Sequence, residues 1–282
     1  MQIKNFKILK LKWLNSPTRW KDSFTVAFAI LATVGTILAI SEISLKDNFG
    51  INCWITRSSV LLGLFFLLVV ATFIIKYFQT KKGISLKIRG IQVNIQQGDI
   101  FNVRGWKVIP FNEFFDITVD DKIIAHNTLN GIFIDKYVEK LGDLQNTIAS
   151  EIDNPKLKRY TRSGRFVYPL GRIITYKDFM LLAFTHFENN EARLTQKDYE
   201  DCLRVMWTEI CRTYANKPVF IPLLGSGITR FDGTPHKSFF DLLKCMLCTL
   251  RTSGANINQP ITILLTEETI QDINIYEMKG VK

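Results

Sequence analysis

Two long stretches without a charged residue constrain this chain more than any other feature. Residues 24–40 and 58–75 are uncharged and apolar, and a short polar loop, 41–57, separates them. At a helical rise of 1.5 Å per residue, each run with its apolar flanks can cross a hydrocarbon core of about 30 Å. A retained membrane hairpin fits better than a cleaved signal peptide, because a long basic region precedes the first run and a second run follows.

The excess of basic over acidic residues lies mainly beside these runs. The net charge is +10, and residues 1–82 contain 11 Lys/Arg against 3 Asp/Glu, so the rest is nearly balanced. A nucleic-acid-binding domain would itself be basic, so no nucleic-acid partner is expected. Both outer flanks of the hairpin are basic while the loop is not, which predicts that both termini face the cytoplasm.

The residues after the hairpin have the pattern of a single α/β domain. We expect a basic amphipathic cytoplasmic segment at 1–22, a two-helix transmembrane hairpin at 23–82 and a nucleotide-binding domain at 83–282. Apolar–polar alternation and helical periodicity predict its elements. The expected strands are 84–89, 91–95, 106–110, 173–176, 180–187, 219–221 and 261–265, and the expected helices are 132–141, 198–215, 235–252 and one from 267. This order predicts a three-layer domain with a mixed sheet.

A glycine-rich loop follows the β-branched and aromatic run 219–221. Its sequence, GSGIT at 225–229, places two glycines around a serine. Such a loop can turn tightly and direct consecutive N–H groups at one point, which is how main chain alone binds an anion. A strand, a glycine-rich loop and a helix in this order are typical of phosphate sites in α/β proteins. An ordinary glycine-containing turn is the alternative.

Catalytic and metal-ligating patterns are weak in comparison. The five cysteines form no disulfide framework, and the CxxC pair Cys245 and Cys248 lies in an apolar helical pattern that favours core packing over metal or redox chemistry. The three histidines are scattered, and the acidic loop with Asp116 and Asp120 has no metal-ligand spacing. We therefore expect no catalytic residues, no metal and no cofactor.

Several motifs in the same order resemble the macro domain, a fold that binds ADP-ribose. Residues 98–101 (GDIF) resemble the family's Gly-Asp-Ile-Thr, in which the Asp, here Asp99, accepts a hydrogen bond from the adenine amino group. Residues 108–112 (VIPFN) resemble a strand that ends in Asn-Ala-Ala-Asn, whose last Asn, here Asn112, reaches the distal ribose. Residues 219–229 resemble the strand and loop whose N–H groups hold the pyrophosphate.

The chain departs from the macro pattern at one loop. The family's triple-glycine phosphate loop is missing, and residues 127–131 are its expected replacement, which puts de-ADP-ribosylation in doubt. The resemblance implies these ligand-binding residues: Asp99, Ile100, Asn112, Asn130, Gly131, Gly225, Ser226, Gly227, Ile228, Thr229, Arg230 and Phe231. Structural alternatives are a turn-forming role for Asp99, local backbone bonding for Asn112, a solvated loop position for Arg230 and core packing for Phe231.

The two spans followed by a macro-like domain resemble the membrane-anchored macro effectors of bacterial Thoeris anti-phage defence. The resemblance implies a receptor and effector, not an enzyme, in the bacterial inner membrane. It would bind an ADP-ribose-derived messenger, such as histidine-linked ADP-ribose, made by a partner TIR-domain NADase. It would then form a homo-oligomer and disrupt the bilayer, an abortive infection response. The alternatives are a membrane-tethered ADP-ribosyl hydrolase or other nucleotide-processing enzyme, and a membrane-anchored sensor without pore activity.

Overall fold

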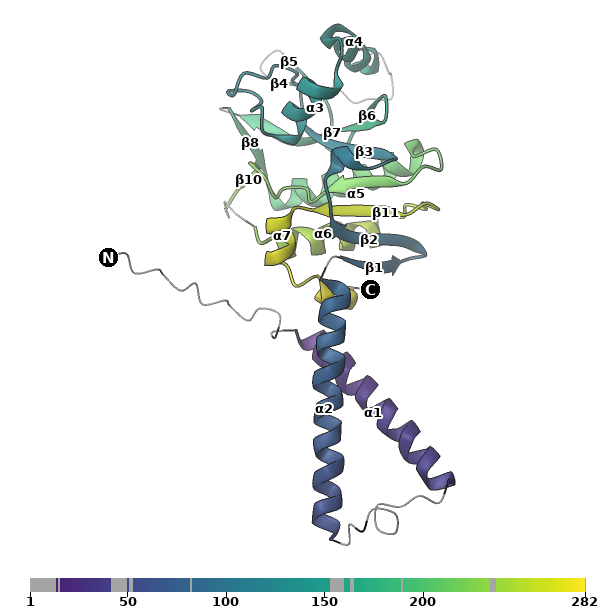
Figure 1. Cartoon of the computed structure of the whole chain (residues 1–282). Helices are drawn as coiled ribbons and strands as arrows, with labels where there is room; N and C mark the ends of the chain where they lie inside the picture. The colour runs from purple at the N-terminus through teal and green to yellow at the C-terminus, as the bar shows by residue number, and fades with distance from the viewer. Residues whose placement is uncertain are drawn as a thin grey trace, which may run out of the picture. The chain divides into compact units, whose positions relative to one another are not determined.

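The chain folds into two compact units, shown in a computed structural model (Figure 1). The structure describes residues 14, 16–41, 50, 53–81, 83–152, 160–162, 165–188, 190–233 and 237–281. Of residues 151–152 and 160–162 it describes the main chain alone. Unit 1 comprises residues 1–83 and Asn274–Gly280, and unit 2 comprises 84–273 and 281–282. The basic segment predicted at 1–22 lies largely outside the described residues.

Unit 1 contains two long apolar helices, α1 (Pro17–Ile40) and α2 (Trp54–Thr80). Both are long and apolar enough to cross a membrane by length and composition. At 1.5 Å per residue they are about 36 and 40 Å long, which exceeds a hydrocarbon core of about 30 Å. The two predicted apolar helices are confirmed, and each extends beyond its uncharged run.

The two helices contact each other through aromatic side chains at one end. The ring centroids of Trp20 and Phe73 are 4.2 Å apart, and those of Phe24 and Phe65 are 5.8 Å apart. Much of the remaining apolar surface is exposed, as with Phe28 at 70% and Leu67 at 64%. Water would not tolerate so large an apolar surface easily, whereas lipid would cover it.

A short segment near the end of the chain belongs to unit 1. Residues Asn274–Gly280, which we call the C-terminal segment, lie mostly in the 3₁₀ helix η2 (Ile275–Val281) and contact α1. Local sequence patterns contain no sign of this contact, because its two sides are more than 250 residues apart.

Unit 2 is built on one mixed sheet with the strand order β1-β2-β11-β9-β3-β7-β8-β10, and β6 also pairs with β7. Strands β2, β11, β9, β3 and β7 are parallel, while β6 and β8 are antiparallel to β7. The strands are β1 (Gly83–Ile88), β2 (Ile91–Gln97), β3 (Trp106–Asn112), β6 (Ile173–Tyr176), β7 (Phe179–Glu188), β8 (Glu191–Leu194), β9 (Val219–Pro222), β10 (Arg230–Phe231) and β11 (Ile261–Leu265). Strands β4 (Tyr160–Arg162) and β5 (Arg165–Val167) form a separate pair.

Helices cover both faces of this sheet. On β7, Ala183 packs in a core cluster with Phe133 of α3 and Leu144 of α4, whereas the ring of the next residue, Phe184, lies 6.0 Å from Tyr199 of α5. Because adjacent strand residues face opposite sides, the sheet lies between two helical layers. The helices are η1 (Ile100–Asn102), α3 (Leu129–Tyr137), α4 (Leu141–Ile152), α5 (Gln196–Thr213), α6 (Phe239–Thr252) and α7 (Glu267–Asp272). The predicted mixed α/β fold is confirmed.

Capping residues move two helix starts away from the predicted positions. Helix α3 begins at Leu129, because the Thr128 side chain accepts a hydrogen bond from the N–H of Gly131. Helix α6 begins at Phe239, because Ser238 caps it in the same way through the N–H of Asp241. Helix α4 and strand β8 were not predicted.

Replacing Gly171 with alanine should destabilise unit 2. Gly171 has φ +88°, and a Cβ there would lie 2.6 Å from the Cys202 carbonyl oxygen and 2.5 Å from Val205 Cβ. Strain and overpacking together should cost about 2–4 kcal/mol. Thermal unfolding of detergent-solubilised protein should show a melting point lower by at least about 5 °C.

Gly90 offers a matched control. It has a similar φ of +90°, but a Cβ there would meet nothing within 4 Å. Gly90→Ala should therefore cost only the backbone strain, about 1 kcal/mol. Equal effects of the two substitutions would contradict the close packing at Gly171.

Candidate functional site

The parallel strands bring three predicted motifs to one edge of the sheet. Strand β11 pairs in parallel with β2 and β9, and β9 pairs in parallel with β3. Their carboxyl ends therefore lie at the same edge, where open α/β sheets bind ligands. Asp99 follows β2, Asn112 ends β3, and the loop 223–229 follows β9.

The loop 223–229 begins with a hydrogen-bonded turn over buried leucines and continues with exposed main chain. Gly225 has φ +84°, and the Ser226 hydroxyl donates to the Leu223 carbonyl at 2.6 Å, which closes a tight turn. Leu223 and Leu224 are buried beneath it. Beyond the turn, Gly227 is exposed and a Cβ there would meet nothing within 4 Å.

Three consecutive main-chain donors at the tip of this loop have no partner within the described part of the chain. Between the residues that the structure describes, the main-chain N–H groups of Gly227, Ile228 and Thr229 form no hydrogen bond. Ile228 is 69% exposed, so the tip of the loop is open to a ligand. Consecutive unpaired N–H groups in an open turn favour an anion.

Asp99 lies at the same edge of the sheet, where it is exposed and caps the 3₁₀ helix η1. Its carboxylate accepts from the Phe101 N–H at 3.0 Å and from Asn102 Nδ2 at 2.8 Å, and so begins η1. An exposed carboxylate has lone pairs for further donors, so this capping role is compatible with binding an amino group. The neighbouring Ile100 has a buried side chain, which leaves only its main chain for a ligand.

The side-chain amide of Asn112 is used within the protein. Its Oδ1 accepts from the N–H groups of Phe114 at 3.1 Å and Asp116 at 3.2 Å, and its Nδ2 donates to Asp116 at 2.8 Å. Asp116 also pairs with Arg165 at 2.6 Å. The geometry matches the local-backbone alternative for Asn112, and the second N–H of its Nδ2 is the donor that remains for a ribose contact.

The predicted replacement loop is held by helix capping. The Asn130 Oδ1 accepts from the Thr128 hydroxyl at 2.7 Å, and the Gly131 N–H donates to the same hydroxyl at 3.3 Å. A Cβ at Gly131 would lie 2.2 Å from the Ala125 carbonyl oxygen. The close approach of this backbone explains the glycine, and in the described part of the chain no hydrogen bond joins Asn130 or Gly131 to the loop 223–229.

Arg230 and Phe231 continue the loop in different environments. Arg230 is exposed and pairs with Glu191 at 3.2 Å, whose pKa is held below its ordinary value by the Arg193 hydrogen bond and by Arg230. Phe231 is buried, with its ring 5.4 Å from Tyr199 in an edge-to-face contact. Phe231 thus supports the loop from the core instead of offering a face to a ligand.

A buried acid and a histidine at this edge were not predicted. Glu113 directly follows β3 with a 1% exposed side chain, and its Oε2 lies 2.6 Å from His186 Nδ1 on β7. The second ring nitrogen of His186 lies 3.9 Å from Asp198. A glutamate next to the end of a buried strand was the available signal, but nothing in the sequence pairs residues 73 positions apart.

Comparisons with known proteins agree with this geometry. A model of the family described as "Thoeris protein ThsA, Macro domain" matches residues 93–266. The Thoeris protein ThsA of Bacillus amyloliquefaciens (strain Y2) is 34% identical over 272 residues, which cover 93% of this chain and 88% of that protein. The chain belongs to the ThsA family.

Solved structures similar to this ThsA-family chain include macrodomains of Oceanobacillus iheyensis. One solved with ADP is 14% identical, covers 70% of this chain and 94% of that one, and has a TM-score of 0.44. A mutant of the same macrodomain is 16% identical, covers 70% and 95%, and has a TM-score of 0.46.

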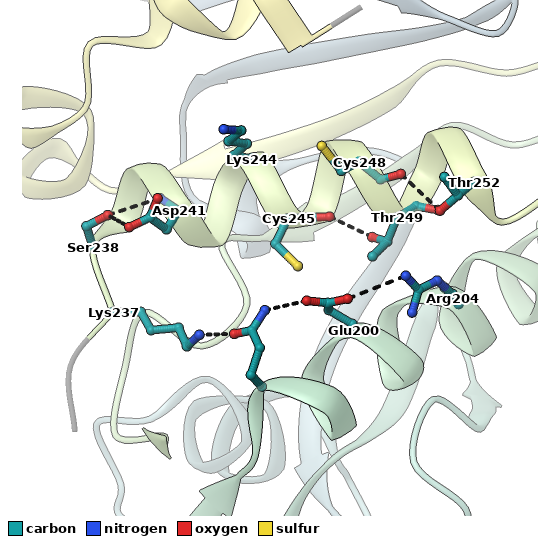
Figure 2. Close-up of a pocket in the computed structure, with 11 residues that line it drawn as sticks. Glu200, Arg204, Lys237, Ser238, Asp241, Lys244, Cys245, Cys248, Thr249 and Thr252 are labelled. Atoms are coloured by element: carbon teal, nitrogen blue, oxygen red, sulfur yellow. Dashed lines mark hydrogen bonds and ion pairs between the residues drawn. The ribbon is translucent and has the colours of Figure 1, made fainter. Parts of the chain in front are cut away.

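A pocket in this ThsA-family chain lies between α5 and α6, and its lining includes no residue of the loop 223–229. It encloses about 580 Å³, and its polar side chains bond to one another, as Gln196 does to Lys237 and to Glu200 (Figure 2). Figure 2 shows the sulfur atoms of Cys245 and Cys248 directed to different sides of α6. Both cysteines are free, and no group of metal ligands exists among the described residues.

Cys245 should react slowly with alkylating agents. Burial raises the pKa of its thiol to about 11, so at pH 8 about one thiol in a thousand is the reactive thiolate. Labelling with iodoacetamide, followed by mass spectrometry, should be at least about tenfold slower than that of glutathione at pH 8 and should rise with pH up to about 11. Rapid labelling at pH 8 would restore the redox alternative for the CxxC pair.

Proposed function

We propose that this ThsA-family chain is a membrane-anchored receptor for an ADP-ribose-type nucleotide. The observation that carries the proposal is the loop 223–229, where consecutive N–H groups have no partner among the described residues and Gly227 and Ile228 are exposed, at the carboxyl edge of a parallel sheet. This loop would hold the pyrophosphate. Asp99, whose carboxylate is exposed at the same edge, would accept from the adenine amino group.

The receptor would also be the effector. Two helices with exposed apolar faces are compatible with anchoring in the inner membrane, with both termini cytoplasmic. A Thoeris family member is expected to answer a messenger made by a TIR-domain partner, and we extend this to histidine-linked ADP-ribose. Binding would favour a homo-oligomer whose spans disrupt the bilayer, because a ligand shifts an equilibrium only toward the state that it binds more tightly.

The substitution Gly227→Glu should abolish nucleotide binding without unfolding the protein. Open space surrounds Gly227, so the new side chain fits but places a carboxylate where the pyrophosphate would lie. Titration calorimetry with ADP-ribose should show at least about a hundredfold loss of affinity, or about 2.7 kcal/mol. Gly227→Ala, which adds no charge, should bind within about threefold of wild type, and unchanged affinity of Gly227→Glu would refute the site.

The effector role is tested in liposomes that contain the full chain and a trapped dye. ADP-ribose or histidine-linked ADP-ribose should release the dye from wild-type liposomes but not from Gly227→Glu liposomes. Native mass spectrometry should show a larger oligomer with the same probes. Binding without leakage or a change in oligomer size would reduce the protein to a sensor.

A second candidate function is hydrolysis of an ADP-ribosyl bond, which the Glu113–His186 pair favours. A buried carboxylate bonded to a histidine is an arrangement that can activate water, and it lies at the edge that holds the candidate site. In that case wild type should release ADP-ribose from an ADP-ribosylated protein, and Glu113→Gln should lower the rate by at least about a hundredfold. Chromatography of the products decides, and no turnover by wild type rejects this candidate.

A further inference from the structure

Helix α1 is capped by a residue from the opposite end of the chain. The first N–H groups of a helix lack partners, and a nearby acid stabilises them. Ser16 at the N-cap makes no capping bond of its own, and the first turn holds no acidic residue. Glu277 supplies the missing group, because its carboxylate accepts from the Thr18 N–H at 3.3 Å, the Thr18 hydroxyl at 2.5 Å and the Ser16 hydroxyl at 2.5 Å.

A buried arginine joins the same segment to both long helices. Arg19 on α1 is 3% exposed, and it donates to Asn274 Oδ1 at 3.2 Å. Its guanidinium lies 4.9 Å from the ring centre of Tyr276, and 5.3 and 5.5 Å from those of Phe73 and Tyr77 on α2. A buried cation needs such partners, so moving the C-terminal segment would disturb α1 and α2 together.

A third contact extends the interface along α1. The Tyr276 hydroxyl donates to Asp22 at 2.7 Å, and the Lys279 ammonium lies 4.2 Å from the centre of the Tyr276 ring. Thr18 and Arg19 lie four and three positions before Asp22, so each is a neighbour of Asp22 on the helix surface. The C-terminal segment therefore holds the first turns of α1 by charge, hydrogen bonds and ring contacts at once.

The segment is joined to the candidate site by a short, structured path. The Leu223 N–H at the start of the nucleotide loop donates to the Leu264 carbonyl of β11 at 3.2 Å. Thr266 directly follows β11 and caps α7, and one residue, the buried Ile273, separates α7 from the C-terminal segment. The chain therefore passes from β11 through α7 to the segment with a single residue between α7 and the segment.

We propose that the C-terminal segment, Asn274–Gly280, couples the nucleotide site to the membrane helices, with Glu277 and Arg19 as positioning residues. The inference rests on the proposed function. It assigns the transmission of the signal to the hydrogen bonds between Glu277 and the start of α1, and not to the direct connection between α2 and β1. Weakening these hydrogen bonds should reduce the membrane response without changing the binding of the nucleotide.

Glu277→Gln tests this coupling in the full chain, because it keeps the size of the side chain and removes its charge. In dye-filled liposomes, the leakage triggered by histidine-linked ADP-ribose should fall at least tenfold, while the affinity for ADP-ribose stays within threefold of wild type. Hydrogen exchange should be at least tenfold faster in the first turn of α1. Glu268→Gln, on an exposed residue of α7, makes the same chemical change and should behave as wild type.

The outcomes separate the coupler from the proposed function. Probe-triggered leakage from Glu277→Gln equal to that of wild type overturns the coupler alone. Dye leakage from liposomes with Glu277→Gln in the absence of any probe also overturns the coupler, because the C-terminal segment would then inhibit the membrane response instead of transmitting it. Unchanged hydrogen exchange in α1 overturns the cap itself. A wild-type chain that binds neither probe overturns the proposed function and the coupler with it.

Discussion

The parallel pairing of β9 on both sides determines the position of the candidate site. Val219 lies opposite Ile261 of β11 and Trp106 of β3, and the Trp106 N–H donates to the Pro218 carbonyl at 2.9 Å. Val219 and Ile221 are fully buried, so a slip by one residue would turn these side chains out of the core. The burial of Val219 and Ile221 therefore fixes where the loop 223–229 leaves the sheet.

The base of the loop 223–229 is held by buried contacts, whereas the N–H groups at its tip have no hydrogen-bond partner among the described residues. Tyr199, fully buried on α5, donates its hydroxyl to the Leu224 carbonyl at 3.1 Å, and Phe231 packs against the same ring. Burial raises the pKa of Tyr199 well above its ordinary value, so this hydroxyl remains a donor. A binding loop supported in this way needs little ordering when a ligand arrives, which lowers the cost of binding.

The sequence predicted those features that depend on local patterns. β-branched and aromatic runs located β9 and β11, and uncharged runs located α1 and α2, because each pattern reflects burial along one element. The roles of single polar residues could not be predicted as well. Asn112 suits either a ligand or the backbone bonds that it makes, and both uses require the same side chain.

Contacts between distant parts of the chain had no sequence signal. The Glu113–His186 pair joins two strands, and the partners of Glu277 lie in the first helix. The position of Glu113 beside a buried strand does not identify its partner, and nothing near Glu277 in the sequence identifies the start of α1. Only the folded chain shows that one is buried beside a histidine and that the other completes a helix.

The cap on α1 has a consequence for how the protein is made. Thr18 leaves the ribosome 259 residues before Glu277, which at about 5–20 residues per second is a delay of roughly 10–50 s. During that interval the first turn of α1 has no acidic residue to accept from its N–H groups. Residues made more than 250 positions later therefore complete this helix, so a chain truncated before Asn274 would contain the loop 223–229 and both long helices without this contact.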